Sequence, residues 1–242
     1  MERHGKSLKF TGWISPRSVM NFIDLKPGKS VEGDQILAFK TDSKASKYVY
    51  LMAGVHGDEV EGVYVLQNLI DWLKEQDDID LPLVVIPILN VDGYRAGTRV
   101  NSHGVDLNRN LPASSWTSAF VEDKYNPGDS AMSEPENKFL DKLFSKFPPK
   151  FILSFHSWVP MINYNGDCKD VADMLSRHNS YQVSADIGYS TPGSLGDYAP
   201  EKYQAPVITF ECPVLADGKS LKEIWEENRA GLENLLKSDL LK

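Results

Sequence analysis

The chain has 242 residues, 41% of them hydrophobic and 25% charged, and its net charge is −8. This length allows one large domain or two small ones, and the composition is ordinary for a globular protein with a sizeable core. The negative charge without a basic cluster argues against nucleic acid as a partner, and no apolar run approaches the ~20 residues that a membrane-spanning helix needs.

The N-terminal segment and the cysteines indicate the location of the chain and the state of its thiols. The first fifteen residues lack the apolar segment of a secretory signal, so we expect a cytoplasmic location. Cys168 and Cys212 are too few for a disulfide framework and are expected to be reduced thiols, with Cys212 a small buried side chain. No repeat or linker divides residues 1–242, which we expect to form a single domain of unknown oligomeric state.

Four continuous apolar runs predict strands that are buried on both faces of a sheet. They cover residues 48–53, 83–89, 151–155 and 206–210. Helical patterns lie between and after them: one at 58–76 with Asp58 as N-cap, one opened by a Ser133 cap and Pro135, and one at 221–236. This alternation predicts an α/β fold with three α/β/α layers around a mixed, mostly parallel sheet.

The first predicted strand leads into His56-Gly57-Asp58-Glu59. A histidine and a carboxylate three residues apart at a helix start can reach one metal ion, and both are ligands that zinc accepts. Taken alone, such a pair is more often a solvated helix start than a metal site, because short motifs recur by chance.

The other predicted strands also end at polar residues, and in open α/β sheets ligands bind beyond the carboxyl ends of the strands. His156 follows the third strand, and Arg99 and the GVDLNRN segment at 104–110 come after the second. His56, Glu59 and His156 would make a hydrolytic zinc site with a fourth position open, where the metal lowers the pKa of a water to roughly 7 and polarises a carbonyl. Three further histidines lack this context: His4, His103 and His178.

The fourth strand ends at Glu211, a carboxylate outside the proposed ligand set. By elimination it is the candidate general base for a water nucleophile, and the alternative is an ion pair with a nearby arginine. Arg99 and Arg109 suit carboxylate groups. One of them could hold a terminal carboxylate while the other stabilises the oxyanion. The residues thus predict a zinc hydrolase that acts next to a free carboxylate.

In the order HGDE, Arg99, GVDLNRN, SFH and TFE, the chain resembles the zinc metallocarboxypeptidases of the carboxypeptidase A type over about residues 45–215. The resemblance implies that His56, Glu59 and His156 bind one zinc ion per chain. It also implies that Glu211 is the general base and that Arg99 polarises the carbonyl.

The same resemblance implies the substrate-binding residues. Asn108 and Arg109 would hold the terminal carboxylate, and Asp106 would orient His56 from behind. Tyr189, which opens a segment rich in Gly and Pro, would close over the substrate as a mobile lid. An aromatic plug in a loop is the alternative for Tyr189, and residues 114–132 are expected to form a rim loop.

Within this family the segments GVDLNRN, SEPE, SFH and GYSTPGSLG are most similar to the bacterial murein peptide amidases. This likeness implies cleavage of the γ-D-Glu–meso-diaminopimelate bond in murein peptides during cell-wall recycling or degradation. The chain departs from the pattern at Leu111, Trp158 and Cys212, and Trp158 is a candidate for the pocket wall. The alternatives are a carboxypeptidase for ordinary peptides, an acylamino-acid deacylase of the aspartoacylase type, and a non-catalytic peptide-binding module.

Overall fold

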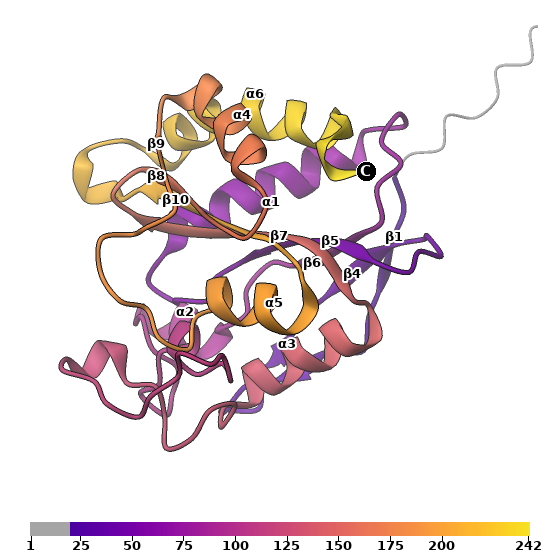
Figure 1. The fold of residues 1–242 in the computed structure, drawn as a ribbon. Coiled ribbons are helices and arrows are strands. Elements are labelled where there is room, and N and C mark those ends of the chain that lie inside the picture. The colour runs from indigo at the N-terminus through magenta and orange to yellow at the C-terminus, as the bar shows by residue number, and fades with distance from the viewer. Residues whose placement is uncertain (1–19) are drawn as a thin grey trace, which may run out of the picture.

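An eight-stranded mixed sheet forms the middle layer of the structure, a computed structural model that describes residues 20–242 (Figure 1). In spatial order the strands are β1 (Phe22–Asp24), β4 (Phe39–Thr41), β6 (Leu83–Ile86), β5 (Tyr48–Ala53), β7 (Pro149–Trp158), β10 (Val207–Pro213), β8 (Met161–Asn165) and β9 (Gln182–Ser184). A separate two-stranded sheet pairs β2 (Gly28–Lys29) with β3 (Gln35–Ile36).

Helices cover both faces of the large sheet. They are α1 (Val60–Lys74), α2 (Val91–Ala96), α3 (Pro135–Lys146), α4 (Lys169–Asn179), α5 (Leu195–Tyr203) and α6 (Leu221–Lys237). Short 3₁₀ helices lie at Leu107–Arg109, Asp123–Tyr125, Leu215–Asp217 and Asp239–Leu241. In Figure 1, α1, α4 and α6 lie above the sheet, and α3 and α5 lie below it. The predicted three-layer α/β fold is confirmed.

The two core layers follow from the alternation of side chains along each strand. Val49 and Leu51 of β5 face the layer of α1, α4 and α6, where Leu66 and Leu232 belong to the same cluster. Tyr50 of β5 points to the other face, and its ring meets that of Phe144 of α3 edge-on, at 4.8 Å between ring centroids.

The four predicted strands are the four central ones, and they run parallel in the order β6-β5-β7-β10. The predicted C-terminal ends of three of them are wrong. β6 stops at Ile86, before Pro87, because proline has no N–H for the ladder. β7 and β10 pair as far as Trp158 and Pro213, so His156 and Glu211 lie inside strands, directly opposite each other, and not after them.

Both predicted caps at the first two helices are also wrong. Glu59, and not Asp58, occupies the N-cap position of α1, and its carboxylate turns away toward two imidazoles. Glu134 precedes Pro135 at the N-cap of α3, while the Ser133 hydroxyl donates to the Glu134 carboxylate. The third helix, α6, is as predicted within one residue and begins with a capping box at Ser220.

Two expectations rest partly on residues that the structure does not describe. His4 and the first fifteen residues, on which the expected cytoplasmic location was based, lie outside residues 20–242. The single domain over residues 1–242 therefore stays a prediction. Within the described range, no helix combines the length and the apolar character that a membrane crossing requires.

Candidate metal centre and active site

Three predicted ligands converge where β5 leads into α1 beside β7. His56 Nδ1 lies 2.6 Å from Glu59 Oε1, and His156 Nδ1 lies 2.8 Å from Glu59 Oε2. The two Nδ1 atoms are 3.2 Å apart, and one donor atom from each residue lies within 4.8 Å of the other two. All three side chains are buried. Two imidazoles and one carboxylate that point at one position are a donor set that fits zinc.

The opposite edge of each imidazole is held by a second partner. His56 Nε2 lies 3.1 Å from Asp106 Oδ1, and His156 Nε2 lies 3.1 Å from the Ser154 hydroxyl. A carboxylate partner assigns the proton of His56 to Nε2, which leaves the Nδ1 lone pair free for a metal. Asp106 is itself fully buried and accepts two hydrogen bonds from Arg99, from Nη2 at 2.9 Å and from Nε at 3.1 Å.

Neighbouring charges decide the ionisation of this cluster. Burial alone would raise the pKa of Glu59, but the imidazoles of His56 and His156 hold it well below its ordinary value. Burial would likewise raise the pKa of Asp106, and His56 and Arg99 lower it. For His56, burial lowers the pKa, and the carboxylates of Glu59 and Asp106 outweigh that effect. Both carboxyl groups are therefore anions, as metal ligation and imidazole support require.

Glycines allow the backbone to pack closely around the cluster. A Cβ at Gly57 would lie 2.0 Å from the carbonyl carbon of Gly93, so the turn after His56 tolerates no side chain there. A Cβ at Gly62 would lie 3.0 Å from the carbonyl oxygen of Phe155, and the Gly62 amide donates to the Ser157 hydroxyl. Helix α1 thus lies directly against the part of β7 that carries His156.

Glu211 lies beside His156 on the neighbouring strand and is 5% exposed. Its Oε2 is buried and has no hydrogen-bond partner among the described residues. Burial, opposed by His156 and assisted by Glu59, raises the pKa of Glu211 to about 7. No arginine of residues 20–242 forms an ion pair with it, which removes the main structural alternative to a proton-transfer role.

Two arginines and two tyrosines line the same cavity as Glu211. Arg109 is 4% exposed, donates from Nη1 to the Asn108 carbonyl oxygen at 2.7 Å, and has no carboxylate partner among the described residues. Its guanidinium carbon lies 5.5 Å from the ring centroid of Tyr125 and 5.9 Å from that of Tyr189. A buried cation without a direct ion-pair partner is a favourable place for a ligand carboxylate.

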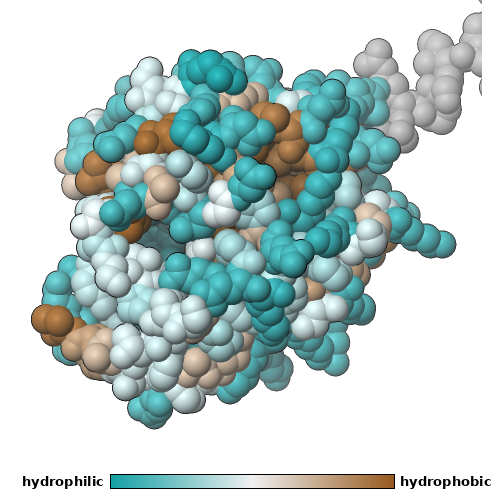
Figure 2. Space-filling model, in the orientation of Figure 1, coloured by the Kyte–Doolittle hydropathy of each residue, from teal (hydrophilic) through white to brown (hydrophobic). Residues whose placement is uncertain are grey.

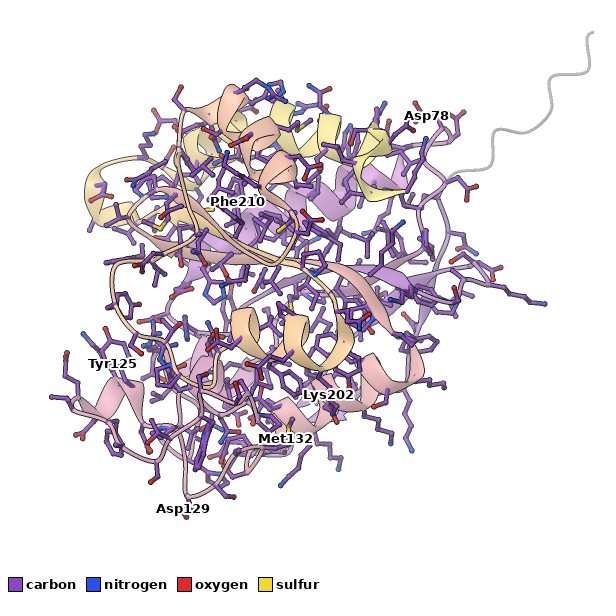
Figure 3. All side chains as sticks on the ribbon, viewed as in Figure 1. Asp78, Tyr125, Asp129, Met132, Lys202 and Phe210 are labelled. Carbon is purple, nitrogen blue, oxygen red and sulfur yellow. The ribbon has the colours of Figure 1, made fainter. Side chains whose placement is uncertain are left out.

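Tyr125 was not among the predicted site residues. Its ring also faces Arg99, at 5.4 Å from the guanidinium carbon, so it contacts both arginines. In Figure 3 it lies at the edge of the molecule, in the 114–132 segment that the sequence predicts as a rim. The scattered aromatic residues of that segment were the available signal, but nothing in the sequence pairs any of them with the arginines.

One cavity of about 730 Å³ joins these groups, and Figure 2 shows the surface hollowed between the two helical layers. Eight of the nine predicted site residues line it: His56, Glu59, Arg99, Asn108, Arg109, His156, Tyr189 and Glu211. Asp106 lies behind His56. Trp158 also lines the cavity, with its ring 5.7 Å from that of Tyr189. Cys212 is fully buried in the core on the other sheet face, in keeping with its expected role.

Comparison with known proteins agrees with this geometry. Residues 18–174 match the family model described as zinc carboxypeptidase. Murein peptide amidase A of Vibrio campbellii is 32% identical over 200 residues, which cover 78% of this chain and 79% of that protein. Murein peptide amidase A of Escherichia coli K12 is 28% identical over 225 residues, with 87% and 88% covered.

Solved structures show the same fold. A murein-tripeptide amidase from Escherichia coli O157 superimposes with a TM-score of 0.74 at 26% identity, over 96% of this chain and 98% of that one. Carboxypeptidase A from Helicoverpa armigera superimposes with a TM-score of 0.72 at 20% identity, over 91% and 69%, and shows the fold alone. The match over more than half of the sequence shows that this chain belongs to the zinc carboxypeptidase family of hydrolases.

Proposed function

We propose that this chain is a zinc-dependent carboxypeptidase that cleaves the γ-D-Glu–meso-diaminopimelate bond of murein peptides. The observation that carries the reaction type is the placement of a His-Glu-His cluster, the unpartnered carboxylate of Glu211 and the unpaired, buried Arg109 around one cavity. The substrate is supported by the relatives named murein peptide amidase A, which align with most of the chain.

His56, Glu59 and His156 would hold one zinc ion. When bound, the metal supplies Lewis acidity, which lowers the pKa of a water and polarises a carbonyl group. The three ligands already converge, and Asp106 and Ser154 fix the two rings, so little rearrangement is needed to receive it.

Glu211 would act as the proton carrier. In this mechanism water adds to the amide carbonyl carbon and gives a proton to Glu211, which then passes it to the leaving nitrogen as the C–N bond breaks. Its unpartnered Oε2 is the atom available for that proton. A pKa raised to about 7 suits a group that must both accept and return a proton near neutral pH.

Arg99 would stabilise the oxyanion that forms when water adds. Two hydrogen bonds to Asp106 and a longer one to Glu59, at 3.4 Å from Nη1, hold the guanidinium beside the metal ligands. Such a fixed cation needs no reorganisation when negative charge develops.

Asn108 and Arg109 would hold the terminal carboxylate of the substrate. The Asn108 side-chain oxygen accepts from the Leu195 amide at 2.8 Å, which leaves its NH₂ group free as a donor. Tyr189 is 39% exposed, and its ring contacts the rings of Tyr125 and Trp158 and the guanidinium group of Arg109, a position that suits a closing lid.

The test is hydrolysis of the murein tripeptide L-Ala-γ-D-Glu-meso-diaminopimelate by the zinc-loaded protein. We expect release of free diaminopimelate and the dipeptide, measured by amine-derivatised chromatography. Release of ordinary C-terminal residues without diaminopimelate would overturn the substrate and keep the carboxypeptidase reaction. Activity on N-acyl amino acids alone would replace both with the deacylase alternative.

A further inference from the structure

We propose that Asn101 is a positioning residue, which holds Arg99 in place by tying its loop to two buried glutamates at the start of helix α3. This inference rests on the proposed function, because Arg99 is the group that would stabilise the oxyanion. Asn101 itself does not line the cavity and does not belong to the metal cluster. It would therefore act only through another side chain.

Asn101 closes the loop of residues 99–106, which we call the Arg99 loop. Its backbone N–H donates to the Val105 carbonyl oxygen at 3.0 Å. Its Oδ1 accepts from the Val105 N–H at 3.0 Å and from the His103 N–H at 3.1 Å. Arg99 comes two residues before Asn101, and Asp106 comes directly after Val105. The ion pair of Arg99 and Asp106 thus joins the ends of a loop whose shape depends on the Asn101 amide.

The other half of this amide attaches the loop to the start of α3. Asn101 Nδ2 donates to Glu134 Oε2 at 2.7 Å and to Glu136 Oε2 at 3.1 Å. Asn101 is 3% exposed, and both hydrogens of its NH₂ group and both lone pairs of its oxygen have partners. Truncation of a side chain that is used so completely leaves buried polar groups unpaired.

Glu134 and Glu136 are the two acidic residues of the SEPE segment. They are 3% and 0% exposed, and neither forms an ion pair with a lysine or arginine in the part of the chain that the structure describes. Burial raises the pKa of Glu134, but the hydrogen bonds that it accepts outweigh this effect and keep it an anion. Such groups are unfavourable in a protein interior unless they are hydrogen-bonded. Because Asn101 donates to both, the two glutamates and the Arg99 loop form one buried unit.

Two further contacts hold the ends of the Arg99 loop. At one end, the Arg99 carbonyl oxygen accepts from Asn90 Nδ2 at 3.1 Å. At the other end, the Asp106 N–H donates to the Asn126 carbonyl oxygen at 2.8 Å. Asn101 fixes the segment between them, so its loss should loosen the Arg99–Asp106 pair without unfolding the loop. A displacement of about 1 Å in a catalytic group can lower the rate by about 100-fold.

The first test measures kcat and KM for the murein tripeptide with the zinc-loaded full chain. Asn101→Ala should lower kcat by about 10- to 100-fold and change KM by less than about threefold, because Arg99 would act on the oxyanion and not on the bound substrate. In an Arg99→Ala background the same substitution should change kcat by less than about threefold, since no guanidinium is left to position. An equal loss in both backgrounds overturns the proposal, and so does a wild-type kcat in Asn101→Ala.

Asn228→Ala is the matched control. Asn228 is 1% exposed, lies in α6 and does not line the cavity. Its Oδ1 accepts from Asn179 Nδ2 at 2.8 Å. Its own Nδ2 donates to the Ile224 carbonyl oxygen at 2.8 Å and to the Tyr181 hydroxyl at 3.1 Å. Both variants should unfold at a lower urea concentration than the wild type, but only Asn101→Ala should lose kcat. An equal loss of kcat in the control would reduce the effect to that of any buried asparagine and overturn the proposal.

Glu134→Ala is a second variant, in case Asn101→Ala does not fold. It removes one partner of the Asn101 NH₂ group and leaves the bonds within the Arg99 loop intact. We expect kcat to fall by about 5- to 50-fold, and by no more than about threefold further in an Arg99→Ala background. A wild-type kcat in this variant overturns the tie to α3.

A last measurement does not depend on activity. The Arg99 Nε–H donates to Asp106 Oδ2, so its exchange with solvent, followed by side-chain NMR and assigned with Arg99→Lys, reports how firmly the pair is held. We expect exchange to be about 10-fold faster in Asn101→Ala and unchanged in Asn228→Ala. Failure of the wild type to cleave the tripeptide overturns the proposed function, and the exchange rate still decides whether Asn101 holds Arg99. Unchanged exchange in Asn101→Ala overturns this inference and leaves the function intact.

Discussion

Glu211 has two properties that rarely occur together in a residue kept only for structure. It is buried next to His156, and one of its oxygens has no partner among the described residues. An unpartnered buried carboxylate is unfavourable unless it serves a ligand or a reaction. Arg109 presents the opposite case, a buried cation without a direct ion-pair partner among the described residues, and both line the same cavity.

The role of Glu211 leads to a first prediction. Glu211→Gln keeps the shape of the side chain but removes its ability to accept a proton, so kcat should fall by about 10²- to 10⁴-fold. Zinc content, measured by elemental analysis, should stay at one ion per chain, because His56, Glu59 and His156 are untouched. Unchanged turnover would reject Glu211 as the base, and loss of zinc with loss of turnover would mark it as a ligand.

Tyr125 gives a second prediction at this scale. Its ring faces the guanidinium groups of Arg99 and Arg109 at 5.4 Å and 5.5 Å, contacts that are worth about 0.5–2 kcal/mol each. Tyr125→Ala should raise KM for the tripeptide by about 5- to 30-fold with a smaller change in kcat, because Arg109 loses one of its two aromatic neighbours. Tyr125→Phe keeps the ring face and should behave like the wild type; an equal defect in both variants would show that the hydroxyl, and not the ring, matters.

Helix α5 carries much of the substrate side of the cavity, and it is anchored from below. Asp141 of α3 accepts hydrogen bonds at Oδ1 from the hydroxyls of Tyr198 and Tyr203, at 2.5 Å and 2.6 Å, and from Lys202 Nζ at 2.9 Å. All three donors lie on α5, so this carboxylate joins the two helices that cover one face of the sheet.

This anchor predicts a pH-dependent loss of stability. Burial raises the pKa of Asp141, and its bonds to Tyr198, Tyr203 and Lys202 together lower it below the ordinary value. A carboxyl whose folded pKa is depressed contributes stability above its unfolded pKa, near 4, and loses it as the pH falls through the folded pKa. Asp141→Asn should therefore reduce the free energy of unfolding by about 1–2 kcal/mol at pH 7, discounted for partial exposure. In urea titrations the difference should shrink below pH 4, and a constant difference from pH 7 to pH 3 would contradict the ionic anchor.

Elements with long apolar patterns were predictable, and those that build the far end of the cavity were not. The bounds of β5 and α6 were predicted within one residue, because the apolar spacing of each is typical of only one kind of secondary structure. β8 was missed because its residues Asn163 and Asn165 face a polar cavity, which breaks the apolar run of a buried strand. α5 was not predicted, because Pro192 and Gly193 before it and Pro200 inside it are together typical of a loop.

The same distinction holds for the site. The convergence of His56, Glu59, His156 and Glu211 was predictable because the carboxyl-terminal parts of neighbouring parallel strands lie at one sheet edge and few residue types can bind zinc. The place of Tyr125 depends on how an irregular segment folds back over the sheet, and no local pattern encodes that path. Local signals alone mispredict the role of Glu59. It occupies the N-cap position of α1, but its carboxylate contacts His56 and His156 and makes no capping hydrogen bond.

At the scale of the whole molecule, the metal cluster joins parts of the chain that are far apart in sequence. His56 and His156 are 100 residues apart, and they belong to the β5–α1 junction and to β7, one of the two middle strands of the parallel region. A ligand that binds only the folded state stabilises it according to its concentration and affinity, by about 2.7 kcal/mol at 100 times Kd. Each kcal/mol corresponds to roughly 2–4 °C in Tm for a chain of 150–250 residues.

Removal of zinc with a chelator should therefore lower Tm by roughly 5–10 °C, and added zinc should restore it. His156→Ala should abolish the zinc-dependent shift, since it removes one of three converging donors. His103→Ala is the matched control, because His103 is exposed and contacts Glu134 away from the cluster, so its zinc-dependent shift should equal that of the wild type. A shift that survives in His156→Ala would place the stabilising metal elsewhere in the chain, and loss of the shift in both variants would show that the effect does not report on the His56–Glu59–His156 cluster.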